Sequence, residues 1–203
     1  MISRKNPIYF LILFIFLFGL SPAMADSISP RQTVENLLGS IKNLKTGRQL
    51  SPEEHKANQK LSYRALALMN LQEVSRKALG KYWKKRTSVE QEGFIDLLGR
   101  MFMKEAFPNS GKFFSTLKLV YGETEISKSK AHVPLTVVHE EEGEIGIEFH
   151  LMKNLGQWQV VDVDLDEVSM RNNLRSQFYK IINKKDYQDL VRRMEEKLKE
   201  TKS

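Results

Sequence analysis

The spacing of hydrophobic residues changes twice along this chain, and the change limits the fold more narrowly than any other feature. From residue 29 to about 107, apolar residues recur every three or four positions, as on one face of a helix. From about 115 to 166 they alternate with polar residues, as in strands with one buried face. From about 168 to 200 the helical spacing returns. This order predicts an α+β fold, with helices, a curved sheet and then closing helices.

Four polar residues mark the starts of the first helices. Ser29, Ser51, Asn70 and Thr87 are each followed three positions later by Glu or Gln, which is the pattern of a capping box. Each helix must bury an apolar face. These faces include Val34, Leu37, Leu38, Ile41 and Leu44 in the first helix, and Phe94, Leu97, Leu98, Met101 and Phe102 in the fourth.

The alternating region predicts a sheet of four strands. Short polar turns at 127–130, 141–143 and 154–156 separate them, and short connections favour an antiparallel meander. The predicted strands are 115–127, 131–140, 143–153 and 156–165. The two closing helices present Met170, Leu174, Phe178 and Ile181 in the first, and Tyr187, Leu190, Val191, Met194 and Leu198 in the second.

The first 25 residues have the pattern of a cleaved signal peptide. Two basic residues precede the apolar run Ile8–Leu20, and Ala23 and Ala25 occupy the small-residue positions of a cleavage site. The run is shorter than the roughly 20 residues that span a bilayer, so an uncleaved anchor is the weaker alternative. We expect export to the periplasm, cleavage after Ala25 and a single domain over 26–203. The chain has no Cys, which excludes a disulfide, a thiol nucleophile and a lipoprotein anchor.

The charge does not indicate a nucleic-acid partner. The formal net charge is +7, but the basic residues are mixed with 25 acidic ones, as on a solvated surface. The basic stretch 76–86 also contains Tyr82 and Trp83, whose helical spacing favours packing inside the protein over stacking on bases. We therefore expect no nucleic-acid partner.

The stretch "VDVDLDEV", residues 161–168, raises the question of a metal loop. A calcium loop starting at Asp162 requires Gly where Glu167 stands and Glu where Asn173 stands, so both key positions fail. The stretch fits a strand better, with Asp162 and Asp164 pointing into water. The opposite face would then carry Val161, Val163 and Leu165.

Signals for an enzyme are few. The histidines, His55, His132, His139 and His150, lack the helical spacing of metal ligands, and no nucleophile or phosphate-binding motif is present. We expect no metal and no cofactor. One alternative stays open: an exported hydrolase could bring His150 and Asp162 together from separate strands.

Two longer stretches together resemble the MlaC, or toluene-tolerance, family of periplasmic phospholipid-binding proteins. The first, Leu71–Phe102, carries Ala78, Leu79, Gly80 and Trp83 before a Thr helix start. The second, Gly156–Ile182, runs from a Gly-x-Trp strand into a Val-Ser-Met turn and a helix; its matching positions are Trp158, Asp162, Val163, Val168, Ser169, Asn173, Arg175, Gln177 and Phe178. The chain departs from the family pattern at Glu167, where Gly is common, and at Leu174, where an aromatic residue is common.

The resemblance implies a nuclear-transport-factor-like curved sheet with a helical subdomain, enclosing an apolar cavity for phospholipid acyl chains. It also implies a monomeric carrier without covalent chemistry, working as the auxiliary component of an ABC transporter in maintaining outer-membrane lipid asymmetry. Its partners would be an outer-membrane lipoprotein complex and an inner-membrane MCE-domain protein with its ABC transporter. A hopanoid is the alternative ligand.

The candidate cavity residues combine this resemblance with the apolar faces described above. Val168 and Met170 are favoured because they match the family motif at the point where strand passes to helix, which would form a rim of the pocket. A lipid phosphate or an acidic partner could be attracted by Lys81, Lys84, Lys85 and Arg86, but a solvated helix end is the favoured interpretation of these four residues. The candidate lipid-binding residues are Phe94, Leu98, Met101, Phe102, Ile147, Phe149, Leu151, Val161, Val163, Leu165, Val168, Met170 and Phe178.

Overall fold

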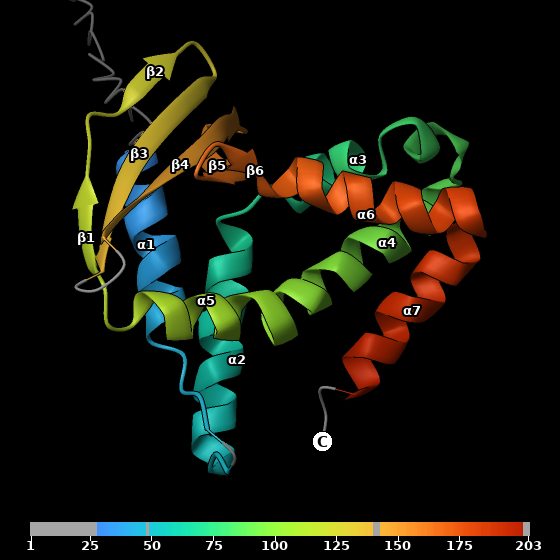
Figure 1. The fold of residues 1–203 in the computed structure, drawn as a ribbon, viewed down its shortest axis with the longest axis horizontal. Helices are drawn as coiled ribbons and strands as arrows, with labels where there is room; N and C mark the ends of the chain where they lie inside the picture. The colour runs from blue at the N-terminus through green and yellow to red at the C-terminus, as the bar shows by residue number, and fades with distance from the viewer. Residues whose placement is uncertain (1–27, 48, 140–142, 201–203) are drawn as a thin grey trace, which may run out of the picture.

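The computed structural model describes residues 28–47, 49–139 and 143–200, so the predicted signal peptide and its cleavage site lie outside the described part of the chain. The α+β prediction is confirmed (Figure 1). The helices are α1 (Pro30–Lys42), α2 (Pro52–Ala67), α3 (Leu71–Leu79), a 3-10 helix η1 (Gly80–Lys85), α4 (Ser88–Met101), a π-helix η2 (Phe102–Ala106), α5 (Phe107–Phe114), α6 (Met170–Lys184) and α7 (Tyr187–Glu200). The strands are β1 (Lys118–Tyr121), β2 (Glu125–Ser127), β3 (Lys130–His139), β4 (Gly143–Asn154), β5 (Gln157–Leu165) and β6 (Val168–Ser169).

The four predicted helix starts are confirmed. Ser29, Ser51, Asn70 and Thr87 each accept a hydrogen bond from the backbone N–H three residues later. At Ser51 and Thr87, the glutamate at that position also accepts from the N–H of the cap residue, which completes the capping box. These caps satisfy backbone donors that the first turn of a helix leaves free.

The sheet is antiparallel, and the predicted meander is confirmed in β3, β4 and β5. The predicted number of four strands is wrong, because the sheet has six strands within the described residues. The first predicted strand is divided into β1 and β2, which pair with different parts of β3. Between them, the N–H of Gly122 donates to the carbonyl of Pro134 at 2.9 Å. The short β6 pairs with the end of β5.

A bulge in β5 changes which side chains face inward. His150 lies opposite Asp162, but the next residue, Leu151, lies opposite Val160, so Val161 has no partner in the ladder. Val160 and Val161 are consequently both buried. The bulge lies beside the strand end that carries the "VDVDLDEV" stretch.

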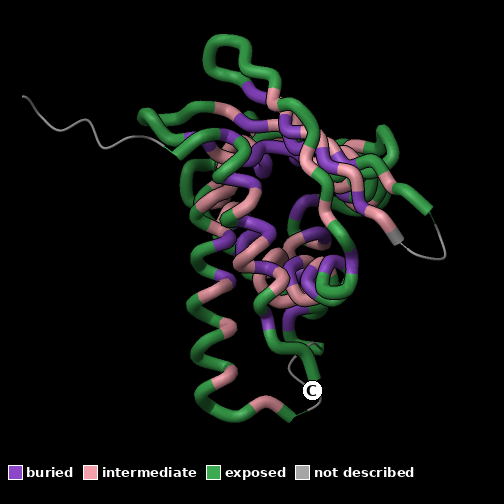
Figure 2. Tube along the Cα trace, turned by 90° about the vertical axis from the view of Figure 1, so that its left-hand side faces the viewer, coloured by how far each residue is buried: buried purple, intermediate pink, exposed green. Residues whose placement is uncertain are grey.

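In the part of the chain that the structure describes, the buried apolar residues form two clusters. One joins the inner face of the sheet to α1 and α5, and the other joins α3, α4, α6 and α7. Phe102 packs against both clusters. Figure 1 shows the sheet with α1 at one end of the molecule and the second helical group at the other. Buried positions gather on α1 and the strands in Figure 2, whereas the outer half of α2 is largely exposed.

The first helical region is longer than predicted. It continues beyond residue 107 through α5 to Phe114, because η2 carries the chain on from α4 without a break. Gly111 allows α5 to lie close against α1, since a Cβ at Gly111 would be 2.5 Å from the carbonyl oxygen of Ile41. Among the described residues, no helix has the length and apolar character needed to cross a membrane.

Candidate functional site

A cavity of about 510 Å³ lies where the two apolar clusters meet. Its walls come from the inner face of the sheet, from α1, from the continuous α4, η2 and α5 segment, and from the start of α6. Most of its surface is apolar. The lining residues are Leu37, Leu38 and Ile41 of α1; Met69; Val74 of α3; Leu98 and Met101 of α4; Phe102, Glu105 and Ala106 of η2; Phe107, Asn109, Ser110, Phe113 and Phe114 of α5; Ile147 and Phe149 of β4; Val160, Val161, Asp162, Val163 and Leu165 of β5; and Met170, Arg171 and Leu174 of α6.

The π-helix η2 shapes one wall of the cavity. Its wider turn lies between α4 and α5 and places Phe102, Glu105 and Ala106 on the lining. A π-helix is rare, and short π segments often occur at functional sites. Here the π-helix joins two helices that wall the same cavity.

The cavity reaches the surface at apolar side chains. Phe113, Leu165 and Met170 line it and are 39%, 40% and 46% exposed. Val168 of β6, which pairs with Leu165, is 58% exposed. The opening therefore has a rim of exposed apolar side chains. A protein usually buries such side chains unless they form a binding surface.

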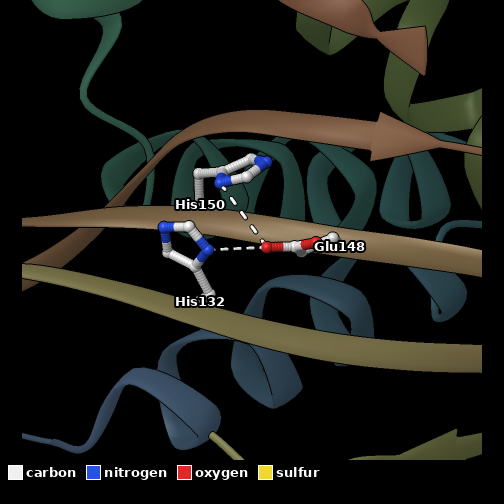
Figure 3. A group of neighbouring side chains, drawn as sticks. All are labelled: His132, Glu148 and His150. Atoms are coloured by element: carbon white, nitrogen blue, oxygen red, sulfur yellow. Dashed lines mark ion pairs between the residues drawn. The ribbon is translucent and has the colours of Figure 1, made fainter. Parts of the chain in front are cut away.

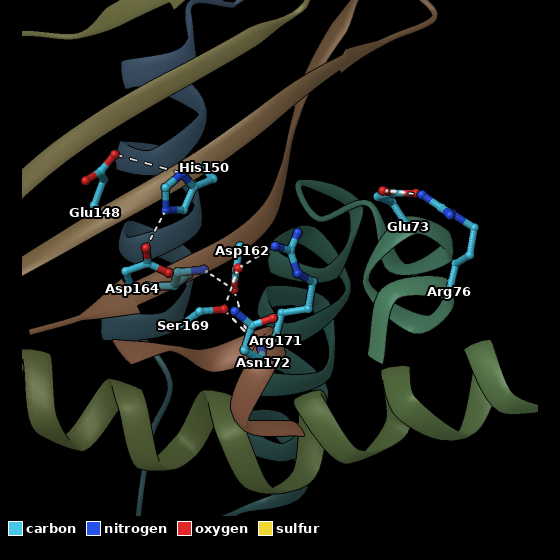
Figure 4. A network of polar contacts seen from close by, with 10 residues as sticks. Glu73, Arg76, Glu148, His150, Asp162, Asp164, Ser169, Arg171 and Asn172 are labelled. Carbon is cyan, nitrogen blue, oxygen red and sulfur yellow. Dashed lines mark hydrogen bonds and ion pairs between the residues drawn. The ribbon is translucent and has the colours of Figure 1, made fainter. Parts of the chain in front are cut away.

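Asp162 is the best-connected polar group of the lining. It is only 6% exposed, so the prediction that it points into water is wrong. Its Oδ1 accepts hydrogen bonds from the backbone N–H of Val163 at 2.9 Å and of Arg171 at 3.0 Å. Its Oδ2 accepts from the Ser169 hydroxyl at 2.7 Å and lies 3.1 Å from Nη2 of Arg171 (Figure 4). Because these donors satisfy the carboxylate, it can be buried at the end of β5.

Nine of the thirteen candidate lipid-binding residues lie on the cavity wall. The structure gathers Leu98 and Met101 of α4, Phe102 of η2, Ile147 and Phe149 of β4, Val161, Val163 and Leu165 of β5, and Met170 of α6.

The other four candidates are absent from the lining. Phe94 and Phe178 meet edge to face, with ring centroids 5.7 Å apart, in the second apolar cluster. Leu151 is buried in the first cluster, and Val168 lies exposed beside the opening. Hydrophobic spacing could not separate these residues from the lining, because packed core and cavity wall have the same pattern.

The basic residues considered for headgroup contacts lie elsewhere. Lys81, Lys84 and Lys85 belong to η1, and neither they nor Arg86 line the cavity. Lys81 lies over the rings of Tyr82 and Tyr179, and Arg86 pairs with Glu90 at 3.2 Å. Among the described residues that line the cavity, the cation is Arg171, which sequence analysis did not single out.

The contact between His150 and Asp162 that was considered for a hydrolase is not formed. His150 contacts Asp164, with 2.8 Å between Nε2 and Oδ2, and Asp162 is held by Ser169 and Arg171 instead. His150 is not part of the cavity lining. Figure 4 shows His150, Asp164 and Glu148 grouped together, with Asp162 beside Ser169 and Arg171.

Sequence analysis missed the contributions of α1 and α5 to the lining. Leu37, Leu38 and Ile41 were recognised as an apolar face but assigned no partner. Phe107, Phe113 and Phe114 form an aromatic group after the predicted end of the helical region. This concentration of aromatic residues just before the first strand was the sequence signal that could have indicated a further cavity wall.

A second hollow, of about 490 Å³, lies between α4 and α7. Several of its lining side chains are charged, including Glu90, Arg100 and Arg192. Burial raises the pKa of Tyr187, which also lines it. A lining with several charged side chains suits an apolar ligand less well than the lining of the first cavity does.

The fold and the first cavity define the class: an α+β protein with an open, apolar ligand cavity between its sheet and its helices. The sequence matches the family described as MlaC protein over residues 31–196, and the chain belongs to this family. A similar solved structure is that of the phospholipid-binding protein from Ralstonia solanacearum in complex with a phospholipid. It is 15% identical, with a TM-score of 0.68, and the match covers 85% of this chain and 96% of that one. Among curated proteins, none matches this chain.

Proposed function

We propose that this chain is a periplasmic lipid-binding protein that holds the acyl chains of a phospholipid in the 510 Å³ cavity. The observation that carries the proposal is an apolar cavity that opens to the surface through an apolar rim. Membership of the MlaC family supports it, and so does the similar fold of a protein described as phospholipid-binding.

The energetics explain why the wall is apolar. Burial stabilises an acyl chain by about 0.8 kcal/mol per methylene, so a 16-carbon chain costs on the order of 12 kcal/mol to expose to water. A protein that carries such a chain through water must cover most of it. A ligand pocket of this kind typically has a volume between about 300 and 1,000 Å³.

We assign the acyl contacts to the nine candidate residues on the cavity wall, together with the apolar residues of α1 and α5 that line it. Near the opening, Arg171 is the cation best placed to meet a lipid phosphate. Its guanidinium is already paired with Asp162 at 3.1 Å, which weakens its attraction for a second anion. A weakly held headgroup favours release, which a carrier requires.

The proposal extends to transport without covalent chemistry. The protein would exchange lipid between an outer-membrane lipoprotein complex and an inner-membrane MCE-domain protein with its ABC transporter, after a signal peptide directs it to the periplasm. Among the described residues, no histidine lines the cavity, so the His and carboxylate pair considered for a hydrolase is not assembled there. This favours binding over hydrolysis.

The proposal is tested by native mass spectrometry of protein purified from the periplasm without detergent, followed by lipid extraction. We expect a mass excess that resolves into phospholipid. A hopanoid in the extract would change the ligand but keep the cavity, whereas protein that is bare in every preparation and takes up no lipid from vesicles would overturn the proposal.

A pair of variants locates the ligand. Met101→Glu places a carboxylate in the cavity wall and should reduce retained lipid at least tenfold. Val89→Glu adds the same charge to the same helix at a position that is 79% exposed, so it should retain lipid as the wild type does. Equal retention by both variants would place the lipid elsewhere.

A further inference from the structure

On the side of the sheet opposite the cavity, three potential metal ligands come together from two strands. His132 of β3 lies directly opposite His150 of β4, and Glu148 is two residues before His150 on the same face. Their neighbours in sequence, Val133 and Phe149, are buried toward the core. The three side chains therefore point outward, and Figure 3 shows them converging.

We propose that His132, Glu148 and His150 form a binding site for one divalent transition-metal ion. One ligand atom from each residue lies within 4.8 Å of the others. Oε1 of Glu148 is 2.6 Å from Nδ1 of His132 and 3.9 Å from Nδ1 of His150. Ligands bound tetrahedrally at the usual zinc distances are about 3.4 Å apart, so these two separations bracket the required value. All three ligand atoms already lie within 4.8 Å of one another, and side-chain rotation would bring them to this spacing around an ion.

Asp164 prepares His150 for this role. Its Oδ2 lies 2.8 Å from Nε2 of His150. An ionised carboxylate only accepts hydrogen bonds, so Nε2 must carry the proton and donate it to this bond. In the neutral ring, Nδ1 is then left with its lone pair directed toward Glu148. A carboxylate that orients a ligating histidine in this way is a common feature of metal sites.

The negative charge around these three residues also favours a bound cation. In the described part of the chain, the ion pairs of Glu148 and Asp164 are made with histidines alone. The second oxygen of Asp164, Oδ1, is buried and has no hydrogen-bond partner among the described residues. Glu125 of β2, directly opposite His132, adds another carboxylate nearby. A bound cation would offset this concentration of negative charge.

The ligand types indicate which cations fit. Two imidazole nitrogens with one carboxylate oxygen suit Zn²⁺ and similar first-row ions, whereas Mg²⁺ and Ca²⁺ prefer oxygen ligands alone. Three protein ligands leave further positions for water. The side chains of His132 and Glu148 are 45% and 42% exposed, so an ion reaches the site from solvent. Sequence analysis missed the site because strand pairing, not helical spacing, brings the ligands together.

The test is a Zn²⁺ titration by calorimetry of untagged protein freed of metal with a chelator. We expect one ion per chain. His132→Ala and His150→Ala should each weaken binding by about 100-fold or more, and Asp164→Asn, which only removes the orienting carboxylate, by about tenfold. The control is His55→Ala on α2, which removes an exposed imidazole remote from the sheet and should bind Zn²⁺ as the wild type does.

A second readout separates metal binding from a purely structural role. Zn²⁺ should raise the unfolding temperature of the wild type and of His55→Ala, and leave that of His132→Ala and His150→Ala unchanged. If the wild type binds no Zn²⁺, or if His150→Ala binds it as tightly as His55→Ala, the proposal is overturned. The titration does not depend on the proposed lipid ligand, because the cavity lies on the other face of the sheet.

Discussion

Asp162 of β5 holds the start of α6 through Arg171. The carboxylate accepts a hydrogen bond from the backbone N–H of Arg171 at 3.0 Å and pairs with its guanidinium at 3.1 Å. The Ser169 hydroxyl, which caps α6, donates to the same carboxylate. These contacts fix the direction in which the chain leaves the sheet, and both Asp162 and Arg171 line the cavity.

Removing this carboxylate should destabilise the protein. Breaking a buried ion pair typically costs about 3–5 kcal/mol. Because the Arg171 side chain is 25% exposed and can reach water, we expect Asp162→Ala to lower the free energy of unfolding by about 2–3 kcal/mol, measured by urea denaturation. The control Asp166→Asn removes an equal charge at an exposed residue with positive φ, which Asn tolerates, and should have little effect. Equal stability of the two variants would contradict the stabilising role of the Asp162 carboxylate.

Local sequence signals predicted much of this fold. The helix starts at Ser51 and Thr87 follow from contacts within four residues, and such contacts can be read directly from the chain. The alternation in β4 predicted the inward positions Ile147, Phe149 and Leu151 for the same reason, and all three are buried. The division of the first strand at Gly122 depends on Pro134, twelve positions away, and was not predicted.

The cavity itself was harder to predict. The burial of Asp162 depends on the bulge at Val161 and on donors from α6, and neither has a local signal. The π-helix η2 has no capping residue to mark it. Whether an apolar face such as that of α1 meets side chains or empty space depends on how distant elements pack, so the spacing of Leu37 and Ile41 could not reveal it.

Gly80 should be intolerant of substitution. It has a φ of +48°, and a Cβ there would overlap the hydroxyl oxygen of Tyr179. That hydroxyl accepts a hydrogen bond from the N–H of Lys81 at 2.8 Å. Gly80→Ala would strain the backbone and displace Tyr179, so we expect it to lower the free energy of unfolding by about 1–3 kcal/mol.

Gly93→Ala in α4 is the control, and it should change the free energy of unfolding in the opposite direction. It lies within a helix, and a Cβ there would have no atom within 4 Å. Gly93→Ala should therefore stabilise the protein by about 0.5–1 kcal/mol, because Ala favours the helix more than Gly does. Thermal or urea unfolding of both variants checks the pair, and a Gly80→Ala protein as stable as the wild type would show that the turn adapts.

Filling the cavity should displace lipid without unfolding the protein. Ala106 lies on the lining, in η2. In Ala106→Trp the indole can occupy part of the cavity volume, so we expect retained lipid to fall about tenfold. Overpacking typically costs about 1–3 kcal/mol, so we expect a loss of stability of that size. Native mass spectrometry and thermal unfolding measure the two effects. Ala67→Trp, at an exposed position of α2, is the matched control and should keep its lipid.

Glu90 should make stability depend on acid pH. It accepts a hydrogen bond from the backbone N–H of Thr87, and this bond, together with the nearby Arg86 guanidinium, lowers the pKa of Glu90. A lowered pKa means that the unfolded chain binds the proton more readily than the folded protein does. The stabilisation is therefore complete above the ordinary glutamate pKa of about 4.3 and is lost as the pH falls through the lower, folded value.

Glu90→Gln isolates this contribution, because Gln keeps a capping oxygen but does not titrate. We expect the unfolding temperature of the wild type to fall more steeply than that of Glu90→Gln between about pH 5 and pH 2. Glu92→Gln, an exposed position of the same helix outside the capping box, should follow the wild type. If all three proteins lose stability in parallel over this range, the capping box at Thr87 is not the source of the acid sensitivity.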